Sequence, residues 1–240
     1  MTHKLMLTAL LLSAANPVPK ETDAAKLARL FGAPAEAAKG CKIALDGDDL
    51  RVTVPAGAHS FRHPGGAPGV RTSRKVTGDF TAQVAVRMKL PDEATGLLAR
   101  EDALVAGGLI VRAGGERTML HLFGWKADRP PRRGGRPGPF DPFFVWGPVG
   151  HDGQGGIKIA PAGASAGARV RLDRRGTVLT AYGDWGGGQK DLFWVCPNGA
   201  ELPGLPAAVE VGVVVEHWLD KPVEVVFSGF EVTPADAPKK

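Results

Sequence analysis

Short segments in which apolar and polar residues alternate run through most of this 240-residue chain, and they limit its fold more than any other feature. In one of them, Leu50, Val52 and Val54 alternate with Arg51 and Thr53. Similar alternation recurs at residues 80–87, 109–112, 119–123, 168–174, 178–182, 209–215 and 223–232. Because successive side chains of a strand point to opposite faces, such segments predict strands with one face in a core. No helical segment of useful length separates them, so the pattern favours an antiparallel β-sandwich over βαβ units.

Glycine and proline divide the chain into short elements. The sequence has 33 Gly and 20 Pro without a collagen-like period, which indicates many turns. Gly176 lies between two alternating segments, where it can take positive φ in a hairpin turn. Residues 22–31 predict a short amphipathic helix that Thr22 or Asp23 caps and Gly32 ends. Residues 127–156, rich in Pro, Arg, Gly and Phe, predict a long loop without strands, which is functional or mobile in most compact domains.

The N-terminus has the pattern of an export signal. A short basic start at His3 and Lys4 precedes an apolar run over residues 5–12 and small residues at 13–15. This run is far shorter than the ~20 residues that span a bilayer, and no later run is long enough, so we expect an exported protein, periplasmic or extracellular, without a membrane span. In an oxidising compartment Cys41 and Cys196 have two alternatives, a disulfide or two separate buried thiols.

Charge and motif content argue against several classes of function. The formal net charge is +5, and the arginines are spread along the chain, so we expect no nucleic-acid partner. His59 and His63 have a three-residue spacing that suits zinc only on a helix, but they stand between Gly57 and Pro64. They are therefore expected to be exposed loop residues, and no metal or other cofactor is predicted. No Ser or Cys has the context of a catalytic nucleophile, and no oligomeric state is indicated.

Several motifs follow one another in a familiar order between residues 39 and 233. A Gly78-Asp79-Phe80 entry opens one strand, and the closing strand contains Phe227 and Phe230. The other segments are residues 39–43, 50–55, 67–71, 107–111, 170–176 and 182–185. Their order resembles the concanavalin A-like lectin/glucanase superfamily, and most closely the domain-of-unknown-function family sometimes labelled "regulation of enolase".

This resemblance implies a two-sheet antiparallel jelly-roll sandwich, whose concave face and rim loops often hold sugars. Members of the closest family mostly lack an assigned activity. The expected organisation is a signal peptide at residues 1–15, a linker with the short helix at 16–38, the sandwich at 39–233 and a flexible tail at 234–240. The chain departs from the family pattern where Asp184 meets Trp185 directly, and in the length of the 127–156 insertion.

The alternation also indicates which polar residues share a face. If Leu109, Leu120, Val170 and their neighbours two positions away face the core, a polar set faces the other way. A saccharide surface needs polar partners for hydroxyls and aromatic rings for the apolar sugar faces. The predicted ligand-binding residues are Arg112, His121, Trp125, Arg171, Tyr182, Asp184, Trp185 and Glu216. The alternative is a solvated sheet face with tryptophans packed as structure.

The expected function is therefore that of an exported, non-catalytic carbohydrate-binding domain. The glucanase branch of the superfamily carries a Glu-x-Asp-x-x-Glu strand, which this sequence lacks. Two alternatives stay open. A divergent glycoside hydrolase or lyase would take its carboxylates from different strands, and an envelope interaction domain would use residues 127–156 on a protein partner. The arginine-rich stretch 129–136 could contact an anionic glycan, although such stretches are more often solvated loops.

Overall fold

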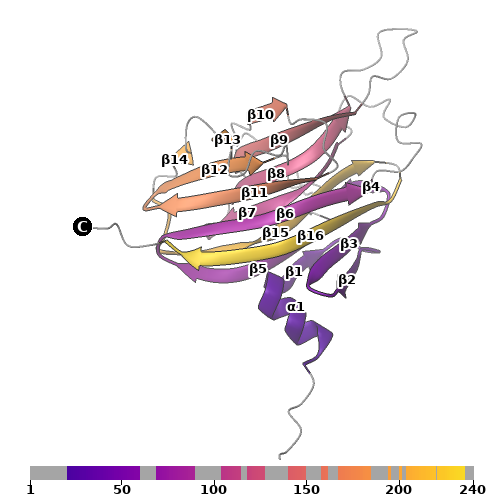
Figure 1. Cartoon of the computed structure of the whole chain (residues 1–240), viewed down its shortest axis with the longest axis horizontal. Coiled ribbons are helices and arrows are strands. Elements are labelled where there is room, and N and C mark those ends of the chain that lie inside the picture. The colour runs from indigo at the N-terminus through magenta and orange to yellow at the C-terminus, as the bar shows by residue number, and fades with distance from the viewer. Residues whose placement is uncertain are drawn as a thin grey trace, which may run out of the picture.

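A computed structural model describes residues 21–59, 69–89, 104–114, 118–127, 140–149, 158–161, 167–184, 194–195, 200–201, 204–219 and 221–235. Two eight-stranded sheets pack face to face, and one short helix, α1 (Asp23–Phe31), lies at the lower edge in Figure 1. All strand pairings among the described residues are antiparallel. The predicted fold class, a two-sheet antiparallel sandwich with a short N-terminal helix, is confirmed.

The first sheet, called sheet A, lies behind the other in Figure 1. Its strand order is β1 (Ala33–Ala37), β5 (Val70–Thr77), β15 (Ala208–Leu219), β7 (Leu104–Arg112), β8 (Thr118–Ala127), β9 (Phe140–Val149) and β10 (Lys158–Pro161). The short strand β4 (Gly57–His59) also pairs with β15. Residues 33–37, expected in a linker, thus form an edge strand of the sandwich.

The second sheet, called sheet B, faces the viewer in Figure 1. Its order is β13 (Trp194–Val195), β12 (Val178–Asp184), β11 (Gly167–Arg175), β6 (Phe80–Lys89), β16 (Val223–Pro234), β3 (Asp49–Val54) and β2 (Lys42–Asp46), with β14 (Ala200–Glu201) paired to β12. The predicted β11–β12 hairpin forms, and its Gly176 has a φ of 58°. Strands far apart in sequence therefore lie side by side, such as β3 and β16.

The main core lies between the sheets. In β6 every second residue from Phe80 to Met88 is buried, and the residues between them are half-buried or exposed. β11 and β3 repeat this pattern, so sheet B has one apolar face and one polar face. The inward residues of β7, β15 and β16 complete the core, which extends to Phe31 of α1. Removal of this apolar area from water is the main favourable term in folding.

Sheet A is buried on both faces in its centre. All residues from Leu104 to Val111 of β7 are buried, although alternate positions face opposite ways. The outward positions form a second apolar cluster of Leu104, Ala106, Ile110, Leu120, Leu122 and Val214. Leu120 and Leu122, predicted in the main core, therefore belong to this outer cluster.

The prediction of a strand-free loop over residues 127–156 is wrong for residues 140–149. These form β9, a ten-residue strand between β8 and β10. Pro142 and Pro148 concealed it, because proline is rare inside central strands. β10 pairs only with residues 143–146, so both prolines lie beyond that ladder, where a missing N–H leaves no gap in it.

No helix in the described ranges has the length and apolar character needed to cross a bilayer. The predicted signal peptide, residues 1–15, lies outside those ranges.

Candidate functional site

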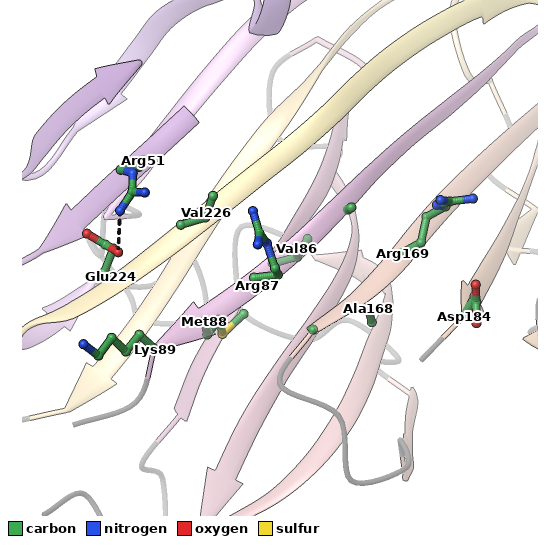
Figure 2. A pocket seen from close by; sticks show the side chains of 12 residues that line it. Arg51, Val86, Arg87, Met88, Lys89, Ala168, Arg169, Asp184, Glu224 and Val226 are labelled. Atoms are coloured by element: carbon green, nitrogen blue, oxygen red, sulfur yellow. Dashed lines mark hydrogen bonds and ion pairs between the residues drawn. The ribbon is translucent and has the colours of Figure 1, made fainter. Parts of the chain in front are cut away.

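A groove of about 660 Å³ lies across the outer, polar face of sheet B. Figure 2 shows how its side chains rise from neighbouring strands. Five strands contribute to the lining, in the spatial order β3, β16, β6, β11 and β12. The charged lining residues are Arg51, Arg87, Lys89, Arg169, Asp184 and Glu224, and Ala85 and Val226 are among the small and apolar ones.

Strand alternation positions each of these side chains. Arg87 and Lys89 are outward residues of β6, whose inward neighbours belong to the core. Arg169 is the outward residue of β11 between Ala168 and Val170, and it lies opposite Asp184 of β12. The cations on the two central strands are therefore flanked by a carboxylate on each side, with Glu224 on β16 and Asp184 on β12.

Part of this charge is neutralised within the protein. Arg51 is 2.7 Å from a carboxylate oxygen of Asp46 and 3.2 Å from one of Glu224. Arg87 is 3.1 Å from a carboxylate oxygen of Asp49. The Arg51–Glu224 contact is drawn on the left of Figure 2, and Arg87 lies nearer the centre of the picture. By contrast, neither Lys89 nor Arg169 forms an ion pair with a residue in the described ranges.

A second polar row crosses the same face next to the groove. The guanidinium of Arg171 lies 4.2 Å from the centre of the Tyr182 ring and 3.2 Å from a carboxylate oxygen of Asp173. On the neighbouring strands, the Gln83 amide donates to Glu231 at 3.0 Å. This row offers a guanidinium, an amide, carboxylates and one aromatic ring, which is the mixture of groups that saccharide hydroxyls and ring faces require.

The predicted site residues whose side chains are described lie in three places: the outer face of sheet B, the outer face of sheet A and the core between the sheets. Arg171, Tyr182 and Asp184 lie on the outer face of sheet B, as predicted for a shared polar surface. Arg112 and Glu216 face away from the main core too, but they belong to β7 and β15 of sheet A, on the opposite side of the molecule. Glu216 is moreover fully buried, so these two do not join the groove.

The predicted orientation of His121, away from the core, is wrong. His121 shares a face of β8 with Met119 and Phe123, which belong to the core between the sheets. Its Nε2 donates to the carbonyl oxygen of Tyr182 at 2.6 Å, so the imidazole connects sheet A to sheet B. The error arose because residues 119, 120, 122 and 123 are all apolar, and alternation cannot assign faces to a strand buried on both sides.

Three other predicted residues cannot be placed by their side chains. Trp125 lies in β8 opposite Val105 in the strand register, but its side chain is outside the described part of the structure, as is the whole of Trp185. Cys196 is also outside it. Cys41 forms no disulfide with a described residue, and its Sγ donates to the carbonyl of Gly69 at 3.0 Å; the Cys41–Cys196 disulfide stays a prediction.

The two groove carboxylates are too far apart to act as a glycosidase pair. Asp184 on β12 and Glu224 on β16 are separated by three strand spacings, which alone amount to about 14 Å. A retaining mechanism needs about 5 Å between carboxyl groups and an inverting one less than about 10 Å.

The histidine spacing noted in the sequence has a different setting from the one expected. His59 lies in β4, half-buried and stacked on His217, instead of in an exposed loop, and His63 is outside the described ranges. In those ranges no group of three or more His, Cys, Asp or Glu residues is placed to hold a metal ion.

Sequence reasoning missed the cations of the groove. Arg51, Arg87 and Arg169 each occupy the outward position of an alternating strand, so the pattern already assigned their face. The missing information was the order of strands in the sheet, because Arg51 and its partner Glu224 are 173 positions apart.

Comparison with known proteins establishes the fold. No family model matches the sequence, and no curated protein matches it either. Among solved structures, a functionally unknown protein from Saccharomyces cerevisiae aligns with a TM-score of 0.59 and 14% identity over 84% of this chain and 95% of that one.

An alginate lyase from Klebsiella pneumoniae aligns with a TM-score of 0.50 and 10% identity, over 81% of this chain and 84% of that one. A GH43 protein from Bacillus licheniformis gives 0.52 and 10%, with 85% of this chain matching 36% of that protein. At these identities the likeness concerns architecture: the chain has the two-sheet sandwich fold that these proteins contain.

Proposed function

We propose that this chain is a carbohydrate-binding sandwich domain that holds a glycan in the groove on sheet B. The observation that carries the proposal is the groove itself, an open recess of about 660 Å³ whose charged side chains come from five adjacent strands. Its volume lies within the 300–1,000 Å³ typical of ligand sites. The sheet beneath it fixes the backbone positions from which the polar side chains extend, which reduces the entropy cost of binding.

The lining suits polyhydroxylated ligands. Guanidinium and carboxylate groups form paired hydrogen bonds with neighbouring hydroxyls, and Arg51 with Glu224 presents both kinds of group side by side. Ala85 and Val226 leave small apolar patches between them, against which the C–H face of a sugar can pack. The separation of Asp184 and Glu224 supports binding without hydrolysis.

A bulky substitution on the groove floor tests this proposal. Ala85→Trp fills the groove from the outward face of β6, and Thr81→Trp places the same side chain on the same face of β6, outside the lining. Glycan-array screening and isothermal titration calorimetry should show saccharide binding to wild type and to Thr81→Trp, and none to Ala85→Trp. Equal binding by the two variants would place the ligand elsewhere, and the absence of binding to wild type would refute the proposal.

Export belongs to this proposal, as does membership of the family labelled "regulation of enolase". The signal-like residues 1–15 support action in the cell envelope or outside the cell. Cell fractionation with N-terminal sequencing of the recovered protein should find it outside the cytoplasm and processed near residue 15. An unprocessed cytoplasmic chain would refute export and leave the binding proposal intact.

A further inference from the structure

We infer that the groove selects acidic glycans, and that Lys89 and Arg169 contact the anionic groups of the ligand. This inference rests on the proposed carbohydrate-binding function and names the class of saccharide. It follows from the ion pairs of the groove, because some of its charged side chains are already paired within the protein and others are not.

The partnered charges cannot discriminate strongly between ligands. Arg51 is held by two carboxylates, Asp46 and Glu224, and Arg87 is held by Asp49. A ligand carboxylate that approaches these guanidinium groups would have to compete with the existing pairs. Such competition reduces the gain from each new contact.

The other two cations are open to a ligand. Lys89 and Arg169 are solvent-exposed and form no ion pair with residues in the described ranges. Asp184 lies opposite Arg169 in the strand register, but no ion pair joins them, and the two side chains stay apart in Figure 2. An anionic ligand group would therefore gain charge-assisted hydrogen bonds here without breaking a pair of the protein.

The positions of these cations fit an extended ligand. Lys89 lies four residues beyond Ala85, which is opposite Arg169 in the register. At about 3.4 Å per residue along a strand and 4.8 Å between strands, their Cα atoms are about 14 Å apart. Arg87 lies between them on the same face. Figure 2 shows the two side chains directed away from each other, so their charged groups are not brought together and the arrangement favours an oligosaccharide with acidic groups on separate units.

The experiment compares glycans that differ only in charge. Oligogalacturonates and their methyl esters form one matched pair, and sulfated carrageenan oligosaccharides and their neutral, desulfated forms are the other. Wild type should bind an acidic member at least tenfold more tightly than its neutral partner, and the pair that responds separates carboxylate from sulfate recognition. Raising the salt concentration from 50 to 500 mM should weaken this binding, because exposed charges are screened.

Variants of the two cations provide the residue-level test. Arg169→Ala and Lys89→Ala should each weaken acidic-glycan binding by about three- to tenfold. Arg175→Ala removes an exposed arginine from the other end of the same strand, β11, and should leave affinity unchanged. Equal affinity for acidic and neutral partners would overturn the inference but keep the proposed function. The absence of binding to every glycan tested would overturn both.

Discussion

Acidification should destabilise this sandwich through one buried histidine, His217. Its side chain is fully buried on the face of β15 that also carries Val215 and Leu219 of the main core. Its Nε2 donates to the carbonyl of Lys221 at 2.9 Å, and the ring of His59 stacks on it with 6.0 Å between ring centres. Burial, with a smaller contribution from the charge of His59, lowers the pKa of His217 to about 4.

The sign and size of the effect follow from linkage. An unfolded histidine has a pKa of about 6.5, so between pH 6.5 and 4 the unfolded chain binds a proton that folded His217 rejects. The stabilising contribution is therefore complete above pH 6.5 and is lost as the pH falls. The loss amounts to about 2 kcal/mol at pH 5 and about 3 kcal/mol below pH 4.

Urea unfolding of wild type and His217→Gln, followed by tryptophan fluorescence at pH 7.5 and 5.0, measures this loss. Glutamine can still donate to the Lys221 carbonyl, but it does not titrate. Wild type should lose about 2 kcal/mol more than the variant over this interval, since other titrating groups are common to both. An identical loss in both proteins would refute the reasoning. Titration of the His217 ring by NMR in wild type gives a second test, which a pKa near 6.5 would contradict.

Three further predictions concern stability and thiol chemistry. Arg174 is buried and donates to three main-chain carbonyls. In urea unfolding, Arg174→Met should therefore lower the free energy of unfolding by about 2–3 kcal/mol, whereas Arg175→Ala, at an exposed position, should lower it by less than about 0.5 kcal/mol. Equal losses in the two variants would contradict this. Gly212→Ala should be more destabilising than Gly114→Ala, because a Cβ at residue 212 would collide with the backbone of β5, whereas one at residue 114 meets open space and strains only a φ of 61°; the same assay decides. Burial raises the pKa of the Cys41 thiol, so if it is free it should react slowly with Ellman's reagent at pH 8 and rapidly in urea. A thiol that appears only after reduction would instead establish the disulfide.

The strand pattern predicted sheet B better than sheet A, for a physical reason. The strands of sheet B have one face in the core and one toward solvent, so polarity alternates and each residue's face can be read directly. The central strands of sheet A are apolar on both faces, and alternation then predicts a strand without telling its two sides apart. His121 and Leu120 were assigned to exchanged faces for this reason.

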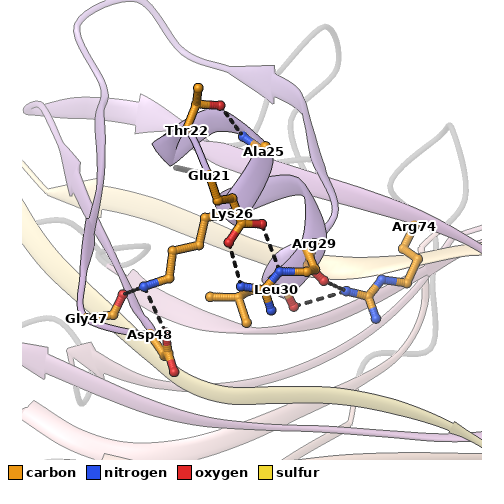
Figure 3. Close-up of polar contacts among 9 residues, drawn as sticks. All are labelled: Glu21, Thr22, Ala25, Lys26, Arg29, Leu30, Gly47, Asp48 and Arg74. Carbon is orange, nitrogen blue, oxygen red and sulfur yellow. Dashed lines mark hydrogen bonds and ion pairs between the residues drawn. The ribbon is translucent and has the colours of Figure 1, made fainter. Parts of the chain in front are cut away.

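The N-terminal helix shows a similar difference between contacts with residues close in sequence and contacts with residues far away in sequence. Thr22 caps α1 as predicted, with its Oγ1 accepting from the amide of Ala25 at 3.2 Å. The contacts that dock the helix come from elsewhere in the chain: Lys26 reaches Asp48 at 2.9 Å, and Arg74 donates to the last helical carbonyls (Figure 3). A cap depends on neighbours three residues away and is readable from sequence, whereas docking depends on the packing of the whole sheet.

The outer faces of the two sheets differ, and this difference explains why a functional site is better sought on sheet B than on sheet A. The centre of sheet A's outer face carries a buried apolar cluster, so its side chains are already occupied in packing. On sheet B the outward side chains are charged, and the structure leaves two of them, Lys89 and Arg169, exposed without an ion pair among the described residues. These two unpaired charges contribute little to the stability of the fold, because they bury no apolar area and neutralise no partner. They do allow a complementary ligand to bind without displacing an existing ion pair, and this is the strongest structural reason to look for an acidic glycan there.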